Sequence, residues 1–269
     1  MADLLALEFV QYALVASIVM GLMLAYLGVH VVERGIVFVD LALGQISMLG
    51  VAAAAYLELN PTVVSIVFTL VGAFLLSLIK VSDARLKVEA VIGIVYAVAS
   101  ALTVLLISKA AHGDSDIQEV LFGSLFTVTS SRLLWMIVVF GALGVVHWVF
   151  RRQFFELTRR QVNHEAVRGG FDVWNFLFYV SIGLTIVLAV AVGGVIPVFS
   201  YLVVPAVAAI LIAKRDAAVV ILAMVLASVA SGLGILLSVG FDLPAGPAIV
   251  SVLGVLCAGA FVVRAMQTR

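Results

Sequence analysis

The stretch that decides the fold is Val64–Ile79, VSIVFTLVGAFLLSLI, whose apolar residues leave no polar face. The run Ile186–Ile196, IVLAVAVGGVI, has the same character. Strands of a membrane barrel alternate apolar with polar residues over about 10 positions, so these runs predict helices. The whole chain is 65% hydrophobic and 11% charged, whereas a soluble domain averages roughly 45–50% apolar and about 25% charged residues. The sequence therefore predicts an all-α membrane protein.

The number of crossings follows from the length of each apolar segment. A helix that crosses the ~30 Å hydrocarbon layer needs about 20 mostly apolar residues. Charges, prolines and polar clusters divide the chain into nine such segments: Phe9–Val31, Ile36–Leu57, Thr62–Ile79, Ala90–Ile107, Leu133–Phe150, Trp174–Val192, Val198–Ala213, Ala217–Val239 and Ala248–Val263. The seventh is short and contains Pro205, so eight crossings are the alternative. Short connections make residues 1–269 a single transmembrane domain, a polytopic helical bundle.

The basic residues predict the orientation of this bundle, because Lys and Arg accumulate in cytoplasmic loops. Assigning alternate connections to one side places Lys109 and Arg132 outside and every other Lys and Arg inside. The inside set is Arg34, Lys80, Arg85, Lys87, Arg151, Arg152, Arg159, Arg160, Arg168, Lys214, Arg215, Arg264 and Arg269. The split predicts an N-terminus outside, a cytoplasmic C-terminus and an odd number of helices.

Charge and motifs exclude several classes of protein. The chain has 15 Lys+Arg and 15 Asp+Glu, so no basic excess supports binding of nucleic acid. Cys257 is the single cysteine, which rules out a disulfide framework. The sequence contains no G-x-x-x-x-G-K-[ST], H-E-x-x-H or G-x-S-x-G motif. We therefore expect no enzyme activity, and uphill transport would need an ion gradient or a separate ATPase.

Two connections are long enough to carry structure of their own. The outside connection holds Asp114, Asp116 and Glu119 and then the apolar piece 120–128, which is too short to span and predicts a re-entrant or interfacial helix. The inside connection 151–172, RRQFFELTRRQVNHEAVRGGFD, holds five arginines. Phe155, Val162 and Val167 recur between the charges at helical spacing, and Gly169 and Gly170 predict the end of this helix. It is either an anchor on anionic membrane lipid or a docking helix for a cytoplasmic partner.

Few polar residues lie at membrane depth. An ionisable side chain there is a functional candidate, because placing an unpaired charge inside the bilayer costs free energy. Asp40 is the clearest, and Ser47 lies about 20° from it around an ideal helix, whereas Gln45 lies about 140° away. Asp40 either pairs with Arg34 or another helix partner, or it is an oxygen ligand on a cation path. Pro205 removes a backbone hydrogen bond and is either a simple kink or part of a translocation path.

The order of several motifs resembles one family of membrane proteins. RGIVFVDLALGQISMLGVA, EAVIGIVYAVASAL, DIQEVLFGSL, GVIPVFSYLVVPAVAA and SGLGILLSVGFDLPAGPAIV follow one another over nearly the full length. Together they are similar to the permeases of bacterial ABC importers for zinc, manganese and iron, the ABC-3 family. In many members a His occupies the place of Gln45, and Gln is a poorer zinc ligand than imidazole.

The resemblance implies a permease in the bacterial inner membrane that forms a dimer with its substrate path between two copies. It implies two cytoplasmic ABC ATPase subunits, an extracytoplasmic metal-binding protein, and a transported divalent metal ion rather than a bound cofactor. The implied path residues are Asp40, Gln45, Ser47, Ser200 and Pro205, with Asp40 as the metal ligand. The implied docking residues are Phe155, Glu156, Arg159, Arg160, His164, Arg168 and Gly169. A gradient-driven carrier, or a permease for a metal chelate, is the alternative.

Overall fold

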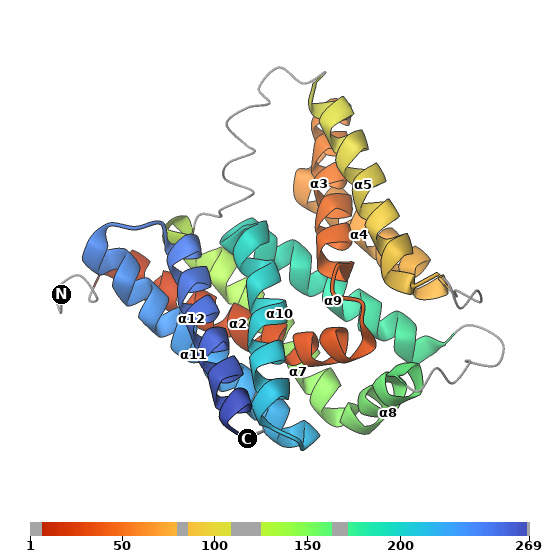
Figure 1. Ribbon diagram of the computed structural model, residues 1–269. Helices are drawn as coiled ribbons and strands as arrows, with labels where there is room; N and C mark the ends of the chain where they lie inside the picture. The colour runs from red at the N-terminus through yellow and green to blue at the C-terminus, as the bar shows by residue number, and fades with distance from the viewer. Residues whose placement is uncertain (1–6, 80–85, 109–124, 163–171, 268–269) are drawn as a thin grey trace. The chain divides into compact units, whose positions relative to one another are not determined.

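The computed structural model describes residues 7–79, 86–108, 125–162 and 172–267, and these residues form helices without any β-strand (Figure 1). In chain order the helices are α2 (Glu8–Arg34), α3 (Val39–Leu57), α4 (Pro61–Leu78), α5 (Val88–Ile107), the 3-10 helix η1 (Leu125–Thr127), α7 (Ser130–Val149), α8 (Arg151–Val162), α9 (Val173–Gly193), α10 (Val195–Ile212), α11 (Asp216–Phe241) and α12 (Ala245–Gln267).

In the described part of the chain, nine helices are long and apolar enough to cross a membrane, namely all except η1 and α8. The predicted set of nine apolar helices is thereby confirmed. The inside connection also contains the predicted helix, α8. Of the predicted apolar piece 120–128, only residues 125–128 are described, and they include η1.

Every membrane helix begins within three residues of its predicted start. For two of the larger shifts, those of α3 and α10, glycine or proline supplies the reason. Helix α3 begins at Val39 rather than Ile36, because Gly35 has φ +64° and residues 36–38 form a turn. Helix α10 begins at Val195 rather than Val198. Pro197 therefore falls in the first turn, where a missing amide hydrogen costs no hydrogen bond.

The chain divides into two compact units. Unit 1 consists of Met1–Val32, Gln118–Val145 and Ala189–Arg269, and unit 2 consists of Glu33–Ile117 and Val146–Leu188. Helices α2, α7 and α9 each contribute residues to both units. That residues 1–269 act as one membrane domain stays a prediction.

Within unit 1, helices α10, α11 and α12 pack on one another, and glycines permit the closest approaches. At Gly28 of α2, an added Cβ would lie 1.7 Å from the carbonyl oxygen of Leu202 in α10. At Gly234 of α11, it would lie 2.6 Å from the Cα of Ile249 in α12. Small residues let helix backbones meet in this way in membrane proteins, where packing replaces the hydrophobic drive.

Within unit 2, helix α3 packs on both α4 and α5. The α3–α4 contact also depends on glycine, because an added Cβ at Gly50 would lie 2.8 Å from the Cα of Ser65. The N-terminus of α4 is capped by Asn60, whose Oδ1 accepts a hydrogen bond from the Val63 amide at 3.2 Å. Pro61 then occupies the first position of the helix, where its missing amide hydrogen costs nothing.

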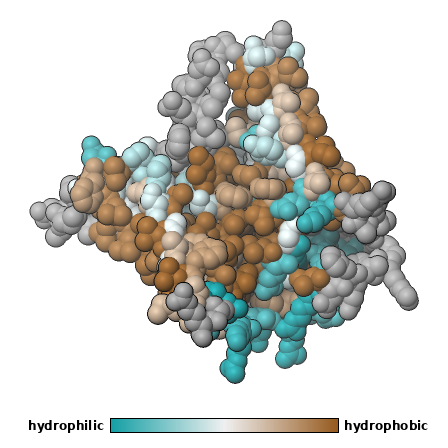
Figure 2. All heavy atoms as spheres, viewed as in Figure 1, coloured by the Kyte–Doolittle hydropathy of each residue, from teal (hydrophilic) through white to brown (hydrophobic). Residues whose placement is uncertain are grey.

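Apolar side chains cover much of the visible surface, and hydrophilic residues gather over α8 (Figure 2). On α5, for example, Ile94, Val104 and Leu105 are all more than 60% exposed. An aqueous surface would not present helices with so many exposed aliphatic side chains, because patches of that size favour association. Contact with lipid hydrocarbon accounts for them.

Candidate functional site

Asp40 lies in the first turn of α3, directly after the turn 36–38. Its side chain is 3% exposed, and its Oδ1 accepts a hydrogen bond from the backbone amide of Leu41 at 2.7 Å. This amide is one of the first N–H groups of α3, which have no carbonyl partner within the helix. A carboxylate here is also favoured by the positive end of the helix dipole.

The predicted alternative partner of Asp40, Arg34, makes other contacts. Its Nε donates a hydrogen bond to Oγ1 of Thr158, and its guanidinium carbon lies 3.7 Å from the ring centroid of Phe178. The hydrogen bond to the Asp40 carboxylate comes from the backbone of its own helix.

The three predicted polar residues of α3 share one helix but not one environment. Asp40 and Ser47 are both buried, whereas Gln45 is half-buried. On an ideal helix, Gly44 lies on the same side as Asp40 and Ser47. A Cβ added at Gly44 would lie 3.9 Å from the Ile186 side chain of α9. The buried pair therefore lies on the side of α3 that meets α9.

The other two predicted path residues, Ser200 and Pro205, lie on α10 in unit 1. Both are buried, and Ser200 donates a hydrogen bond to the Ile196 carbonyl at 2.9 Å. Helix α10 continues through Pro205, whose ring nitrogen has no hydrogen to donate to the carbonyl of Tyr201 one turn earlier. The Tyr201 side chain is anchored by a hydrogen bond between its Oη and Oγ of Ser231 at 2.5 Å.

In the part of the chain that the structure describes, no group of three or more His, Cys, Asp and Glu side chains could hold a metal ion. Asp40 is thus a single carboxylate with hydroxyl and amide groups on the same helix. Structural zinc sites use four protein ligands and calcium sites use six to eight oxygens. One carboxylate suits a site that an ion passes better than a site where an ion resides.

Helix α8 supplies the second candidate region, and its buried face is defined by three residues. Phe154, Leu157 and Thr158 are each less than 5% exposed, and the spacing of three and four positions places them on one side of the helix. Phe155 is only half-buried and Val162 is 50% exposed. The apolar pattern of the sequence does not distinguish Phe154 from Phe155.

The buried face of α8 packs in an aromatic cluster that sequence analysis did not identify. The Phe154 ring stacks on His147 of α7 with centroids 4.0 Å apart and an interplanar angle of 12°. It also meets Trp174 edge-on at 5.9 Å and lies 6.4 Å from Phe178, both on α9. The sequence signal was only that these aromatic residues flank the inside connection; packing brings them together.

Hydrogen bonds fix the end of α8 relative to the start of α9. Asp172 caps α9, because its Oδ1 accepts hydrogen bonds from the amides of Trp174 and Asn175 at 2.9 and 3.2 Å. The Gln161 side chain donates to Oδ1 of Asn175 at 3.2 Å, and Asn175 donates to the Ser77 carbonyl at 3.1 Å. Helix α8 is therefore held to α9, which in turn is held to α4.

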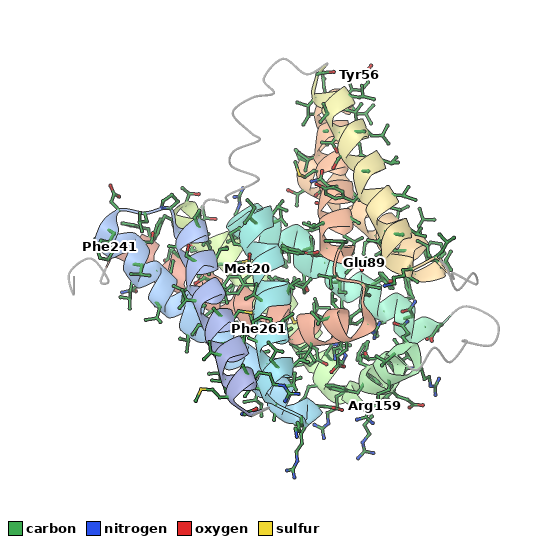
Figure 3. The ribbon with its side chains drawn as sticks, viewed as in Figure 1. Met20, Tyr56, Glu89, Arg159, Phe241 and Phe261 are labelled. Atoms are coloured by element: carbon green, nitrogen blue, oxygen red, sulfur yellow. The ribbon has the colours of Figure 1, made fainter. Side chains whose placement is uncertain are left out.

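The opposite face of α8 is polar and exposed, and it contains the described docking candidates. Arg159 and Arg160 are exposed, as is Glu156, which forms an ion pair with Arg160 one turn away. Figure 3 shows the Arg159 side chain extending outward from α8. An exposed pair of this kind contributes only about 0–1 kcal/mol to stability, so these charges are not needed to hold the fold. His164, Arg168 and Gly169 lie outside the described residues.

Comparisons with known proteins agree over most of the chain. The family model of the ABC 3 transport family matches residues 6–264. The manganese transport system membrane protein MntC of Listeria monocytogenes is 27% identical over 98% of this chain and 94% of its own length. The high-affinity zinc uptake system membrane protein ZnuB of Haemophilus influenzae is 26% identical over 90% of this chain and 93% of its own length. The solved structure of PsaBC from Streptococcus pneumoniae in complex with Fab has a TM-score of 0.81 at 26% identity, covering 97% of this chain and 94% of that chain.

Proposed function

The chain belongs to the ABC 3 transport family, and on this premise we propose that it is the membrane-spanning permease subunit of an ATP-binding cassette importer for a divalent transition metal ion. Manganese is the first candidate and zinc the second, because relatives that cover at least nine tenths of this chain are named for manganese transport and zinc uptake. Iron, or a metal chelate, is the further alternative. The observation that carries the proposal is the match over residues 6–264, in a chain with nine candidate membrane helices among its described residues.

The energy for import comes from separate ATPase subunits. The 269-residue sequence contains no phosphate-binding loop of the G-x-x-x-x-G-K-[ST] type. The proposed docking surface is the exposed face of α8 with Phe155, Glu156, Arg159 and Arg160, continued by His164, Arg168 and Gly169. The buried contacts of Phe154 and the hydrogen bonds around Asn175 support this role, because they hold α8 firmly enough to receive a mechanical input.

The assembly contains a second permease copy and an extracytoplasmic metal-binding protein, and it lies in the bacterial cytoplasmic membrane. The distribution of Lys and Arg supports an N-terminus outside and a cytoplasmic C-terminus. The proposed path residues are Asp40, Gln45, Ser47, Ser200 and Pro205. Asp40 contacts the ion through its carboxylate, since carboxylate oxygens suit Mn²⁺.

Reconstitution tests this function. The chain, together with the ATPase that purifies with it, is placed in liposomes, and uptake of Mn²⁺ and Zn²⁺ is measured with ATP and with a non-hydrolysable analogue. We expect uptake only with ATP, and ionophores that dissipate proton and sodium gradients should leave it unchanged. Uptake by the chain alone, driven by an imposed gradient, would contradict the proposal and favour a secondary carrier.

Replacing Asp40 with Asn tests the metal ligand. The Asn oxygen can still accept the hydrogen bond from the Leu41 amide, so the start of α3 is preserved while the negative charge is lost. We expect Mn²⁺ uptake to fall about ten-fold or more, because a neutral amide binds a hard cation less well than a carboxylate does. The measurement is initial uptake at equal amounts of folded protein.

Asp242→Asn is the matched control for this change. Asp242 is exposed and caps the C-terminus of α11 with φ 53°, a left-handed conformation that Asn also adopts. The Asp242→Asn variant loses the same charge outside the proposed path, so its Mn²⁺ uptake should equal that of the wild type. Unchanged uptake in Asp40→Asn would remove Asp40 from the path.

A further inference from the structure

Arg34 extends from the end of α2 to two helices that are distant in the sequence. Its Nε donates a hydrogen bond to Oγ1 of Thr158 in α8 at 3.0 Å. Its guanidinium carbon lies 3.7 Å from the ring centroid of Phe178 in α9, a distance at which a cation is attracted to the ring face. One side chain thus joins the α2 terminus to α8 and to the helix that supports α8.

Thr158 is positioned to receive this hydrogen bond. It is 1% exposed, and its Oγ1 donates its hydrogen to the Phe154 carbonyl at 3.1 Å. Because the hydroxyl hydrogen points along its own helix, an oxygen lone pair remains for the Arg34 N–H. Hydrogen bonds from a charged donor are stronger than neutral ones, and water exclusion strengthens them further.

The polypeptide continues from Arg34 directly to the candidate path residue. Gly35 ends α2 with φ +64°, residues 36–38 form a turn, and α3 begins at Val39 with Asp40 in its first turn. The turn is closed by a hydrogen bond from the Val39 amide to the Ile36 carbonyl at 3.0 Å, and both residues are buried. A displacement of Arg34 would therefore be passed through this short, fixed turn to the start of α3.

The contacts of α8 differ in how they respond to movement. The stack of Phe154 on His147 is apolar and has no fixed direction along the ring plane. The Arg34–Thr158 hydrogen bond, by contrast, weakens steeply with distance and angle, and the guanidinium carbon lies 3.7 Å from the Phe178 ring centroid. The aromatic stack therefore helps to hold α8 in place, whereas the directional contact passes a displacement of α8 on to Arg34.

We propose that Arg34 and Thr158 are positioning residues that couple α8 to the turn before α3, so that movement of the docking helix reaches Asp40. This inference rests on the proposed function, because it requires an ATPase that acts on α8. It goes beyond that function by assigning the transmission to one hydrogen bond and one cation–π contact. Neither residue contacts the ion in this scheme.

The test separates transport from ATP hydrolysis. Thr158→Val removes the acceptor oxygen while nearly preserving the shape of the side chain. Arg34→Lys keeps the charge but loses the planar guanidinium that suits both the Thr158 hydrogen bond and the Phe178 ring. In liposomes with the copurifying ATPase, each variant should move about ten-fold fewer Mn²⁺ ions per ATP hydrolysed, the scale of one lost charge-assisted hydrogen bond. ATPase retention and ATP hydrolysis should stay near wild type, and Thr158→Ser should restore the ratio.

Thr103→Val is the matched control. Thr103 is also buried, and its hydroxyl donates to the Ala99 carbonyl one turn back at 2.8 Å. The change removes the same group from α5, away from Arg34, and the ratio of Mn²⁺ to ATP should not change. The double variant Arg34→Lys with Thr158→Val should be no worse than either single variant, because both act through one contact.

The outcomes distinguish this inference from the proposed function. If the wild-type complex transports Mn²⁺ with ATP and both Thr158→Val and Arg34→Lys keep its ratio of ions to ATP, the inference is overturned and the function stands. If the wild-type complex shows no uptake that depends on ATP, the proposed function is overturned and the inference with it. Equal losses in Thr103→Val and Thr158→Val would also overturn the inference, because any buried hydroxyl would then matter.

Discussion

Replacing Arg159 and Arg160 together with Glu is expected to abolish retention of the ATPase by the purified chain. Both arginines are exposed on the face of α8 opposite to Phe154, and the Arg159 side chain extends outward (Figure 3). Reversing two charges turns attraction to an acidic partner surface into repulsion, and charge changes at close contacts cost several kcal/mol. We expect an affinity loss of about a hundredfold, measured by titrating labelled ATPase onto the chain in nanodiscs.

Insertion and folding of the double variant should remain normal, because Arg159 and Arg160 are both exposed and the ion pair between Arg160 and Glu156 contributes little to stability. Lys214→Glu with Arg215→Glu is the control, since it reverses two exposed charges in another connection of the same predicted side. ATPase binding should survive there. If the Arg159 and Arg160 variant keeps the ATPase affinity of the wild type, these arginines do not dock the ATPase and the docking proposal is wrong.

Gly28→Ala is expected to prevent correct packing of α2 on α10. The added methyl carbon would lie 1.7 Å from the Leu202 carbonyl oxygen and 2.8 Å from its carbonyl carbon. These are backbone atoms of α10, so no rotamer change relieves the overlap and the helices must separate. Overpacking costs about 1–3 kcal/mol and occasionally more, and we expect the upper end of that range.

The measurement is the temperature at which the detergent-solubilised chain loses its monodisperse elution peak. A loss of about 3 kcal/mol lowers a melting temperature by roughly 10 °C in a chain of this size. Gly254→Ala in α12 is the matched control, because a Cβ there meets no atom within 4 Å, and Ala is the better helix former by about 1 kcal/mol. Equal melting temperatures for the two variants would show that α2 and α10 do not approach at Gly28.

The membrane helices could be predicted from the sequence because the signal for each is local. A run of about 20 apolar residues is sufficient to define a crossing, and all nine predicted segments correspond to helices of the described chain. Helix α8 was predicted for a similar reason, from charged and apolar residues at helical spacing. The family was also visible in the sequence, since five motifs in a fixed order identify it.

The candidate site was predicted less completely. Asp40 was predicted from the sequence, but it lies nearer the start of its helix than expected, because Gly35 and the turn 36–38 delay the start of α3. Arg34 was predicted as a cytoplasmic charge and as an alternative partner for Asp40. The hydrogen bond to Thr158 joins positions 124 residues apart, and no pattern within either segment indicates it.

Hydropathy and charge along the chain determined where helices cross the membrane and that α8 is amphipathic, and five motifs in a fixed order identified the family. These properties depend on each residue and its near neighbours, so the sequence alone carries them. Which aromatic residue of α8 is buried, which helix Arg34 reaches and how closely Gly28 approaches α10 were decided only by tertiary structure. Each depends on contacts between residues far apart in the chain, because close packing selects one neighbour among many apolar residues of similar hydropathy.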